Sequence, residues 1–516
     1  MTLKNIVMKK ISKYIYILGF GAATLTSCNM DVTPTYSISY QDGDTLITSK
    51  DNLEKMENGI LSSYRSCQYG EFSQAEEVMC DGFNATQDYG NNYGGIHRMD
   101  DSFTAGDYYV QDFWSYNYSA IKDYNIYIAA LELYSPKTTA LQAEAKVCKG
   151  EVYFFRAASY LQLVRHFAKA YNSSSAATDL AVPVVLKYDQ NAKPARNTVK
   201  DVYAQIKIDL DEAAADLASV SGTIGAQKPT IDAVNALYAR YYLDIADYSN
   251  AAISAMKVIN SSAGYALSSS TAAMTAEYIN DSGTEPIMQL YASLSENGSG
   301  TNDIYTKASY YADWAAYHNG VYFTPWFLPS QKLLNTYENS DLRFSAWYSN
   351  TYINYLASNG YLGDFYTFIK YLGNPTLTSG NTPNARQHVK PFMIGEMYLI
   401  AAEAYLKSTD AGSAKTILNK LQTARGASAT DATMPNIENE WFKETVGEGL
   451  RLSCIKRWGE GFTARVGQTG ALGDKVLMTG ASYTDKSMSS SDYHLVWPIP
   501  TYEMKVNSNL VQNIGY

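Results

Sequence analysis

Two stretches of the chain decide its fold. They are residues 235–259, NALYARYYLDIADYSNAAISAMKVI, and residues 397–421, MYLIAAEAYLKSTDAGSAKTILNKL. In each, an apolar segment with helical spacing ends near a Tyr-Leu pair, and a short polar turn follows. A second apolar segment comes next, and one of its Ala residues lies eight positions after the Leu of the pair. Small Ala residues at this spacing let paired helices approach closely. Each stretch therefore predicts a helix–turn–helix pair.

These pairs resemble tetratricopeptide units, but they are not in tandem, because 163 residues separate Tyr242-Leu243 from Tyr405-Leu406. Residues 151–171, EVYFFRAASYLQLVRHFAKAY, share the helical stripe. Further helices are expected from about Asp51 to Tyr64 and near Phe113–Leu133. The sequence thus predicts a mainly α frame of tetratricopeptide-like helix pairs that is interrupted by a large insert.

The predicted insert, residues 265–385, is rich in Ser, Gly, Asn, Thr, Tyr and Trp and lacks long helical stripes. Residues 81–112 have a similar Gly-, Asn-, Asp- and Tyr-rich composition and predict a long loop. Loops on a rigid frame are where binding usually lies. The composition of the insert therefore predicts that it is a loop-rich ligand-binding region.

The N-terminus has the order of a secretory signal: four Lys residues, an apolar run from Tyr14 to Leu25, and then Thr26-Ser27-Cys28. The run is too short to span a bilayer, which needs about 20 apolar residues. A Cys directly after small residues resembles a bacterial lipobox, so Cys28 is the predicted lipidation site. The chain is expected to comprise a signal peptide (1–27), a lipid-anchored tether (28–45), an N-terminal helical part (46–264), the insert (265–385) and a C-terminal helical part with a packing tail (386–516).

Charge narrows the choice of ligand. The signal holds four of the 41 basic residues and no acidic residue, so 37 basic and 51 acidic residues remain, a net charge of −14. Such a chain repels nucleic acid and anionic lipid surfaces, and a neutral or cationic ligand suits it better. Beyond Cys28, the four cysteines form no CxxC pair. Small buried thiols are expected, and a Cys67–Cys80 bridge stays open.

A search for catalytic and metal motifs is negative. The five His residues form no HExxH pair, and the chain has no GxSxG elbow and no P-loop. The adjacent acids Glu76 and Glu77 are expected to be solvated, and His166 is expected to be structural. No catalytic residue, metal ligand or cofactor is predicted.

Aromatic residues give the best indication of a binding site. The chain has 45 Tyr and 7 Trp against 16 Phe, and Tyr adds a polar hydroxyl to a rigid flat ring that suits the apolar face of a sugar. The candidates lie in the loops 81–112 and 290–330, where rings have little core to join. The predicted ligand contacts are Tyr89, Asn92, Tyr93, Tyr310, Tyr311, Asp313, Trp314, Tyr317 and Asn319, with Trp314 as the leading candidate. Packing roles are predicted for Trp114, Trp326, Trp441, Trp458 and Trp497.

Several motifs in the right order resemble the SusD/RagB family of outer-membrane nutrient-binding lipoproteins. They are the lipobox at Cys28, residues 150–171 followed by AVPVVL at 181–186, the helix with Glu396-Met397-Tyr398-Leu399, the stretch 448–462 (EGLRLSCIKRWGEGF), and the ending WPIP at 497–500 with Glu503, Asn507, Gln512-Asn513 and Gly515-Tyr516. The apolar residues of that ending, Val511 among them, are expected to pack back on the frame.

The resemblance implies an α-rich fold, a position at the outer face of an outer membrane, and a SusC-like TonB-dependent transporter as partner. Family members capture glycans, or in some cases peptides, without chemistry. Our interpretation is a non-catalytic surface lipoprotein that binds a glycan. A peptide-binding member of the family, a glycan-cleaving lipoprotein and a pure scaffold are the alternatives, and the choice between glycan and peptide stays open.

Overall fold

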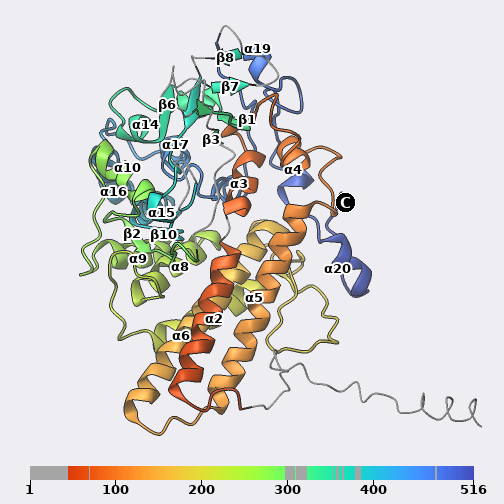
Figure 1. Cartoon of the computed structure of the whole chain (residues 1–516), viewed down its shortest axis with the longest axis vertical. Helices are drawn as coiled ribbons and strands as arrows, with labels where there is room; N and C mark the ends of the chain where they lie inside the picture. The colour runs from red at the N-terminus through yellow and green to blue at the C-terminus, as the bar shows by residue number, and fades with distance from the viewer. Residues whose placement is uncertain are drawn as a thin grey trace, which may run out of the picture. The chain divides into compact units, whose positions relative to one another are not determined.

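The computed structural model describes residues 45–68, 70–296, 308–309, 322–350, 353–355, 360–362, 365–377, 385–470 and 473–516. Residues 47–516 form one unit, and helices dominate it (Figure 1). The predicted mainly α fold is confirmed. The predicted signal peptide and Cys28 lie outside the described residues. In the part of the chain that is described, no helix is both long and apolar enough to cross a bilayer.

Most of the described helices begin at a residue whose polar side chain caps them. Ser49 caps the first one and Thr198 forms a capping box with Asp201. In chain order the helices are α2 (Lys50–Cys67), α3 (Gly70–Met79), α4 (Gly94–Arg98), α5 (Tyr108–Leu133), α6 (Thr139–Phe167), α7 (Val199–Asp216), α8 (Ile231–Asp244), α9 (Tyr248–Ile259), α10 (Thr271–Ile279), α13 (Gln331–Leu334), α14 (Leu342–Trp347), α15 (Ile394–Lys407), α16 (Ala411–Ala424), α17 (Met434–Glu444), α18 (Arg451–Trp458), α19 (Gly473–Val476) and α20 (Thr501–Val506). Short 3-10 turns lie at Pro375–Leu377 and Tyr493–Leu495.

The two helix–turn–helix pairs form as predicted, as α8–α9 and α15–α16. Both turns use one residue in the left-handed region, Ala246 (φ +61°) and Thr409 (φ +68°), followed by an Asp that caps the next helix. The pairs also pack on each other, because α9 lies against α15. Helices far apart in sequence therefore join into one frame.

The rest of the frame extends from these pairs without a break. Helices α2, α5 and α6 pack together, α6 packs on α7, α7 on α8, and α15 on α16 and α17. Figure 1 shows α2, α5 and α6 running side by side in the lower part of the view. Helices on both sides of the insert therefore share this frame. The predicted domain boundaries stay predictions.

Short strands lie between the helices, most of them within the predicted insert, residues 265–385. The described strands are β1 (Phe83–Ala85), β2 (Pro286–Met288), β3 (Ala308–Ser309), β4 (Tyr322–Phe323), β5 (Phe327–Pro329), β6 (Tyr348–Asn350), β7 (Ile353–Tyr355), β8 (Gly360–Leu362), β9 (Tyr366–Phe368) and β10 (Phe392–Met393). Among them, β1 pairs with β5, β2 with β10, and β6 with β9, all antiparallel. A further sheet has the order β3-β4-β7-β8, with β4 and β7 parallel.

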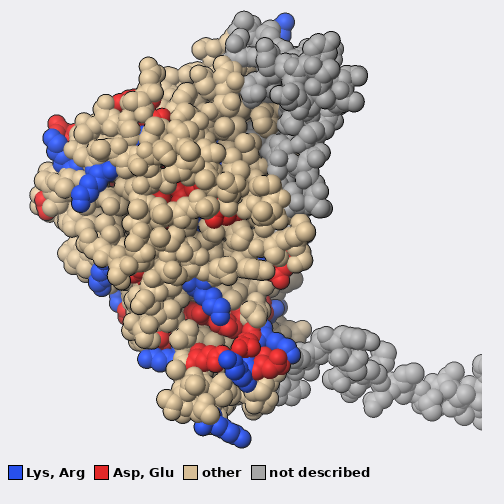
Figure 2. Space-filling model, turned by 60° about the vertical axis from the view of Figure 1, so that its left-hand side comes forward, with Lys and Arg blue, Asp and Glu red and all other residues tan. Residues whose placement is uncertain are grey.

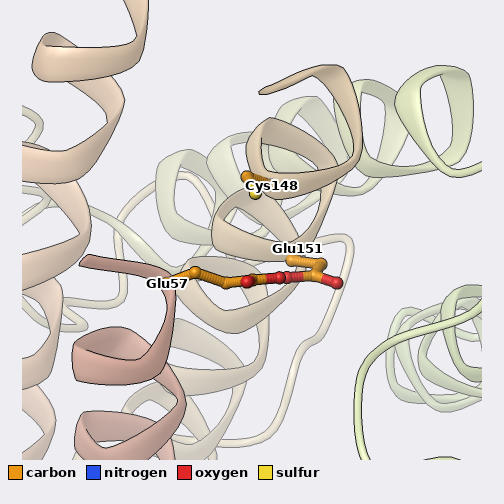
Figure 3. A group of neighbouring side chains, drawn as sticks. All are labelled: Glu57, Cys148 and Glu151. Atoms are coloured by element: carbon orange, nitrogen blue, oxygen red, sulfur yellow. The ribbon is translucent and has the colours of Figure 1, made fainter. Parts of the chain in front are cut away.

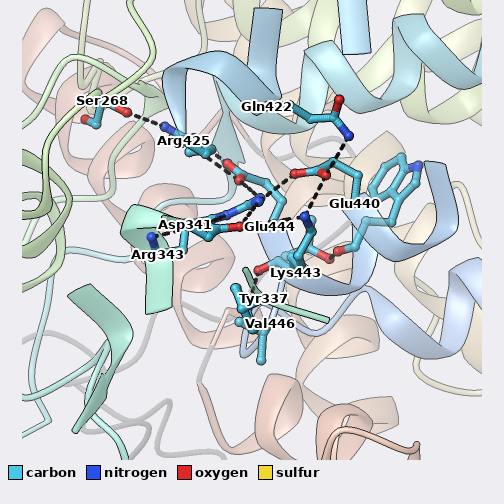
Figure 4. A network of polar contacts seen from close by, with 12 residues as sticks. Ser268, Tyr337, Asp341, Arg343, Gln422, Arg425, Glu440, Lys443, Glu444 and Val446 are labelled. Carbon is cyan, nitrogen blue, oxygen red and sulfur yellow. Dashed lines mark hydrogen bonds and ion pairs between the residues drawn. The ribbon is translucent and has the colours of Figure 1, made fainter. Parts of the chain in front are cut away.

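A buried network of charges fastens the insert to the C-terminal helices (Figure 4). Arg425, at the end of α16, donates from Nη1 to Glu285 Oε1 (2.6 Å) and from Nε to Glu444 Oε2 (3.0 Å). Arg343 of α14 donates to the same Glu444 oxygen (2.8 Å) and to Asp341. Because Glu285 and Arg343 belong to the insert, these bonds fix it on the frame.

Three of the five Trp residues with a predicted packing role are buried. Trp114, Trp441 and Trp497 are buried, whereas Trp326 and Trp458 are half-buried. The C-terminal string packs back through Trp497 and Ile499. The expectation for Val511 is wrong: its side chain is 58% exposed, because it is the carbonyl of this residue that is anchored, by Arg196 Nη1 at 2.9 Å.

The four described cysteines, Cys67, Cys80, Cys148 and Cys454, are free and buried. The expectation of small buried thiols is confirmed for all four. The open possibility of a bridge between Cys67 and Cys80 is thereby closed.

Candidate ligand-binding site

Strand pairing brings two predicted site segments to the same place. In the antiparallel pair β1–β5, Ala85 lies opposite Phe327. Just beyond this pair, Thr86 donates from its backbone N–H to Trp326 O (2.9 Å) and from its hydroxyl to Pro325 O (3.0 Å). The chain that leaves β1 toward Tyr89 and Tyr93 and the chain that enters β5 from residue 322 therefore meet at one end of the pair.

A third segment, residues 476–483, which no sequence motif indicates, joins them there. Met478 N–H donates to Ala85 O (2.9 Å), and Gln87 N–H donates to Val476 O (2.7 Å). The hydroxyls of Tyr89 and Tyr483 are hydrogen-bonded at 3.0 Å. No sequence signal marks this segment, because backbone pairing across some 390 positions depends on the tertiary fold.

The loop 89–99 is held in an unusual backbone conformation. Besides Gly90, the residues Asn91 (φ +60°), Tyr93 (φ +55°) and Met99 (φ +45°) occupy the left-handed region. A side chain at Gly95 would place its Cβ 2.6 Å from Ser102 O. Non-glycine residues in this region cost energy, and such strain gathers at binding sites. The loop is thus a tightly preformed feature at the end of β1.

Tyr89 and Tyr93 are buried, with 6% and 4% of their surface exposed. Tyr93 stacks on Tyr109 with ring centroids 4.0 Å apart and donates its hydroxyl proton to Gln74 Oε1 (2.9 Å). Both rings meet Phe327 edge to face. The expectation that these rings have little core to join is wrong, since β5 supplies that core. Their contact with a ligand stays a prediction.

More accessible groups surround the two buried rings. Asn92 is half-buried and donates from Nδ2 to Tyr89 O (2.6 Å). Tyr109 is half-buried, and Tyr108 is 79% exposed. Arg98, which the sequence analysis did not single out, donates to the Tyr89 hydroxyl (3.1 Å) and to Asn91 Oδ1 (2.7 Å). The loop therefore offers rings, amides and one guanidinium.

Burial raises the pKa of Tyr89 to about 12, and the neighbouring Tyr483 hydroxyl adds to the effect. The phenol is therefore protonated at neutral pH and can both donate and accept a hydrogen bond. The remaining predicted contacts, Tyr310, Tyr311, Asp313, Trp314, Tyr317 and Asn319, lie outside the described residues.

A polar cavity of about 130 Å³ lies deeper, between α3, α6 and the turn before α18. Glu76 and His166 face it, with His166 Nε2 3.1 Å from Glu76 Oε2. The expectation that Glu76 and Glu77 are solvated is wrong, because both are buried. Burial, together with the charge of Glu76, raises the pKa of Glu77 to about 8. The cavity is smaller than the ~300–1,000 Å³ of ordinary ligand pockets.

Among the described side chains, one group has the spacing of a metal site: Glu57, Cys148 and Glu151, on α2 and α6. It shares no residue with the loop 89–99 or with the polar cavity. No motif predicted it, because its members come from two distant helices.

Comparison with known proteins identifies the family. A family model described as starch-binding and associating with the outer membrane matches residues 31–243, and the SusD family model matches residues 247–516. The chain belongs to the SusD family. Members of this family are in general binding proteins associated with the outer membrane. No curated protein sequence matches the chain.

Solved SusD-family structures share the fold over almost their whole length. A SusD superfamily protein from Bacteroides thetaiotaomicron is 24% identical, with a TM-score of 0.74 over 90% of this chain and 99% of that one. One from Bacteroides vulgatus is 19% identical, with a TM-score of 0.69 over 90% and 99%. A laminarin-binding SusD-like protein is 19% identical, with a TM-score of 0.67 over 91% and 100%.

The SusD-family stretch 448–462 has a structural role in this chain. Arg451 forms a two-pronged pair with Asp81 (2.9 and 3.0 Å). Although burial alone would raise the pKa of Asp81, the guanidinium of Arg451 holds it well below its usual range. Lys456 Nζ donates to Ala168 O (2.7 Å), at the C-terminal end of α6. These residues fasten α18 to the end of α6 and to the segment that follows α3.

Proposed function

We propose that this SusD-family protein is a cell-surface lipoprotein that captures an oligo- or polysaccharide and delivers it, uncleaved, to a SusC-like TonB-dependent transporter. One observation carries the proposal: the β1–β5 pair joins the strained, aromatic loop 89–99 to β5, which lies shortly after the Tyr-rich segment 310–319 that contains Trp314. Membership of a family of binding proteins supports it. The fold shared with a laminarin-binding protein makes a β-glucan a reasonable first ligand to test.

In this proposal Trp314 is the main residue that stacks on the sugar, and Tyr310, Tyr311 and Tyr317 also contact the ligand. Asp313, Asn319 and Asn92 orient the sugar hydroxyls. The buried rings of Tyr89 and Tyr93 pack beneath the surface and support the loop, and the more exposed ring of Tyr109 stacks on Tyr93. Flat rings give contact area at low entropic cost, and the amides and carboxylate supply direction.

Calorimetry with laminarin and starch oligosaccharides tests the site, using the full chain with Cys28→Ala. Trp314→Ala, Tyr311→Ala and Tyr109→Ala should each weaken binding by about 1–3 kcal/mol, as expected for an aromatic hot spot. Tyr188→Ala, at an exposed Tyr outside the candidate loops, is the matched control and should bind like the unmodified site. If the three site variants also bind unchanged, the site lies elsewhere. A panel in which peptides bind and glycans do not would favour the peptide alternative.

Incubation of the protein with a glycan that it binds tests the absence of catalysis. No new reducing ends should form, because the sequence contains no catalytic motif and the buried Glu76 is already paired with His166. Turnover that one carboxylate substitution abolishes would establish the glycan-cleaving alternative instead.

The lipid anchor is tested separately. Cys28→Ala should leave export intact and release the protein from membranes. The test uses a strain that lacks the partner transporter, because binding to the transporter could hold the unlipidated protein at the membrane. Cys67→Ala, at a buried thiol, is the control and should stay with the membranes. A Cys28→Ala protein that still sediments with membranes would refute the anchor.

A further inference from the structure

Three side chains with metal-binding atoms converge between α2 and α6. Cys148 and Glu151 are three residues apart on α6 and so share one face of that helix, while Glu57 comes from α2. A carboxylate oxygen of each Glu and the sulfur of Cys148 all lie within 4.8 Å of one another. Figure 3 shows the two carboxylates reaching toward each other with the sulfur beside them. The three residues are only 7%, 1% and 1% exposed.

One of these atoms is unsatisfied. Within the described part of the chain, Glu151 Oε2 is buried and accepts no hydrogen bond from an N–H donor or a hydroxyl. Its neighbour is the carboxylate of Glu57, and two carboxylates that face each other need a proton or a cation between them. A buried carboxylate oxygen without a partner is costly, so such a group calls for a ligand. Lys228 Nζ pairs with Oε1 of Glu57, and the second oxygen of that carboxylate can bind an ion without breaking the pair.

A cavity of about 710 Å³ lies next to the three side chains. Its lining includes Glu54 and Glu144 as well as the three residues themselves. Figure 2 shows acidic side chains, with basic ones between them, at the height where α2 and α6 lie in Figure 1. Lys50 pairs with both Glu54 and Glu144, so the acids at this end of the helices outnumber but do not exclude cations. An acid-lined hollow concentrates cations, and it leaves room for water at an open coordination position.

We propose that Glu57, Cys148 and Glu151 bind one zinc ion, with a water from the cavity as fourth ligand. Sulfur with two carboxylates suits Zn²⁺ and not Ca²⁺ or Mg²⁺, which take oxygen ligands. The ligand atoms of a tetrahedral zinc site lie roughly 3.3–3.8 Å apart, so small side-chain rotations bring these atoms into place. The ion ties α2 to α6 and does not depend on the proposed glycan function.

The charges balance when zinc binds. On binding, the Cys148 thiol gives up its proton, as does any protonated carboxyl of the pair, and these protons leave to water in the adjoining cavity. One thiolate and two carboxylates then carry three negative charges, and Lys228 and Zn²⁺ carry three positive ones. Buried charges are tolerated when they are compensated in this way. The exposed half of the Lys228 side chain lets its ammonium adjust as the ion enters.

The test uses untagged full chain with Cys28→Ala, stripped with a chelator and titrated with ZnCl₂. We expect one zinc per chain by elemental analysis after gel filtration, and a higher melting temperature in zinc than in chelator. CaCl₂ and MgCl₂ should cause no such rise. Titration with CoCl₂ should give a thiolate-to-cobalt charge-transfer band, which reports directly on sulfur ligation.

Cys148→Ala and Glu151→Gln should each weaken zinc binding at least tenfold, and Cys148→Ala should abolish the cobalt band. Cys454→Ala, at another buried thiol, and Glu144→Gln, at a cavity acid outside the three ligands, should behave like the parent. The proposal is overturned if the parent binds no zinc, gives no cobalt band, or binds zinc equally well after both ligand substitutions. If Cys148→Ala does not fold, the cobalt band of the parent and the zinc affinity of Glu151→Gln still test whether the site binds zinc.

Discussion

The indole of Trp497 occupies the middle of an aromatic cluster and is fully buried. Its Nε1–H points at Met79 Sδ, 3.2 Å away. Four rings surround it at centroid distances of 4.7 to 6.3 Å: those of Phe103, Phe113, His166 and Phe167. The side chain therefore links the C-terminal string to α5 and α6.

Trp497→Ala should lower the free energy of unfolding by about 3–5 kcal/mol, because it leaves a cavity among rings that cannot close it. Urea unfolding followed by circular dichroism measures the change. Tyr108→Ala, at an exposed ring on the start of α5, is the control and should shift the free energy by no more than about 0.5 kcal/mol. Equal stabilities of the two variants would contradict a packing role for Trp497.

At the scale of elements, the two helix pairs repeat each other in detail. The backbone N–H of Asp247 donates to Tyr242 O and that of Asp410 donates to Tyr405 O, both at 2.9 Å. The same 163-residue offset that separates the Tyr-Leu pairs therefore holds for the turns. The second helix of each pair presents a fully buried Ala, Ala251 or Ala414, to its neighbour.

Ala414→Leu should destabilise the protein by about 1–3 kcal/mol, since the contact between α15 and α16 has no room for a larger side chain. The matched control is Ala411→Leu in the first turn of the same helix, where the side chain is exposed; it should be close to neutral. Thermal unfolding of the two variants side by side makes the comparison. A neutral Ala414→Leu would mean that the helices do not pack as closely as the sequence pattern indicates.

At the scale of the whole molecule, the buried charge network around Arg425 joins the insert to the C-terminal helices. Burial alone would raise the pKa of Glu444, but the guanidinium of Arg425, and then that of Arg343, lowers it to about 2. The unfolded chain binds a proton at this carboxyl already near pH 4.5. The stabilising effect of ionised Glu444 is therefore complete above that pH and is lost as the pH falls toward 2.

Glu444→Gln should consequently be much less stable than the parent at pH 7, because it leaves two buried guanidinium groups short of a charge. The difference in unfolding free energy between parent and variant should shrink, by on the order of 3 kcal/mol, as the pH falls from 5 to 2. Urea titrations at several pH values measure it. Glu460→Gln, at an exposed acid, should show no comparable trend, and a pH-independent difference for Glu444→Gln would count against the ionised network.

Much of the candidate site escaped prediction, for a physical reason. The composition of residues 81–112 and 290–330 indicated loops that carry rings, but composition does not say which ring is covered. Tyr93 is covered because β5, some 230 residues away, lays Phe327 against it. The segment 476–483 escaped because nothing in its own residues signals that it pairs with Ala85 and Gln87.

By itself, the sequence determined the family, the two matched pairs and several of the long helices, because helical periodicity, turn residues and motif order are local properties of a chain. Residues 81–112, predicted as one long loop, also contain α4 and the first turn of α5. The tertiary structure alone decided where the polar groups lie. From the sequence, Glu76 and Glu77 are expected to be solvated acids. In the folded chain both are buried: Glu76 pairs with His166, and Glu77 accepts a hydrogen bond from the Gly449 N–H. The zinc ligands Glu57 and Cys148 are 91 positions apart and become neighbours only when α2 packs on α6. Burial and charge pairing depend on partners distant in the chain, and only the folded chain brings those partners together.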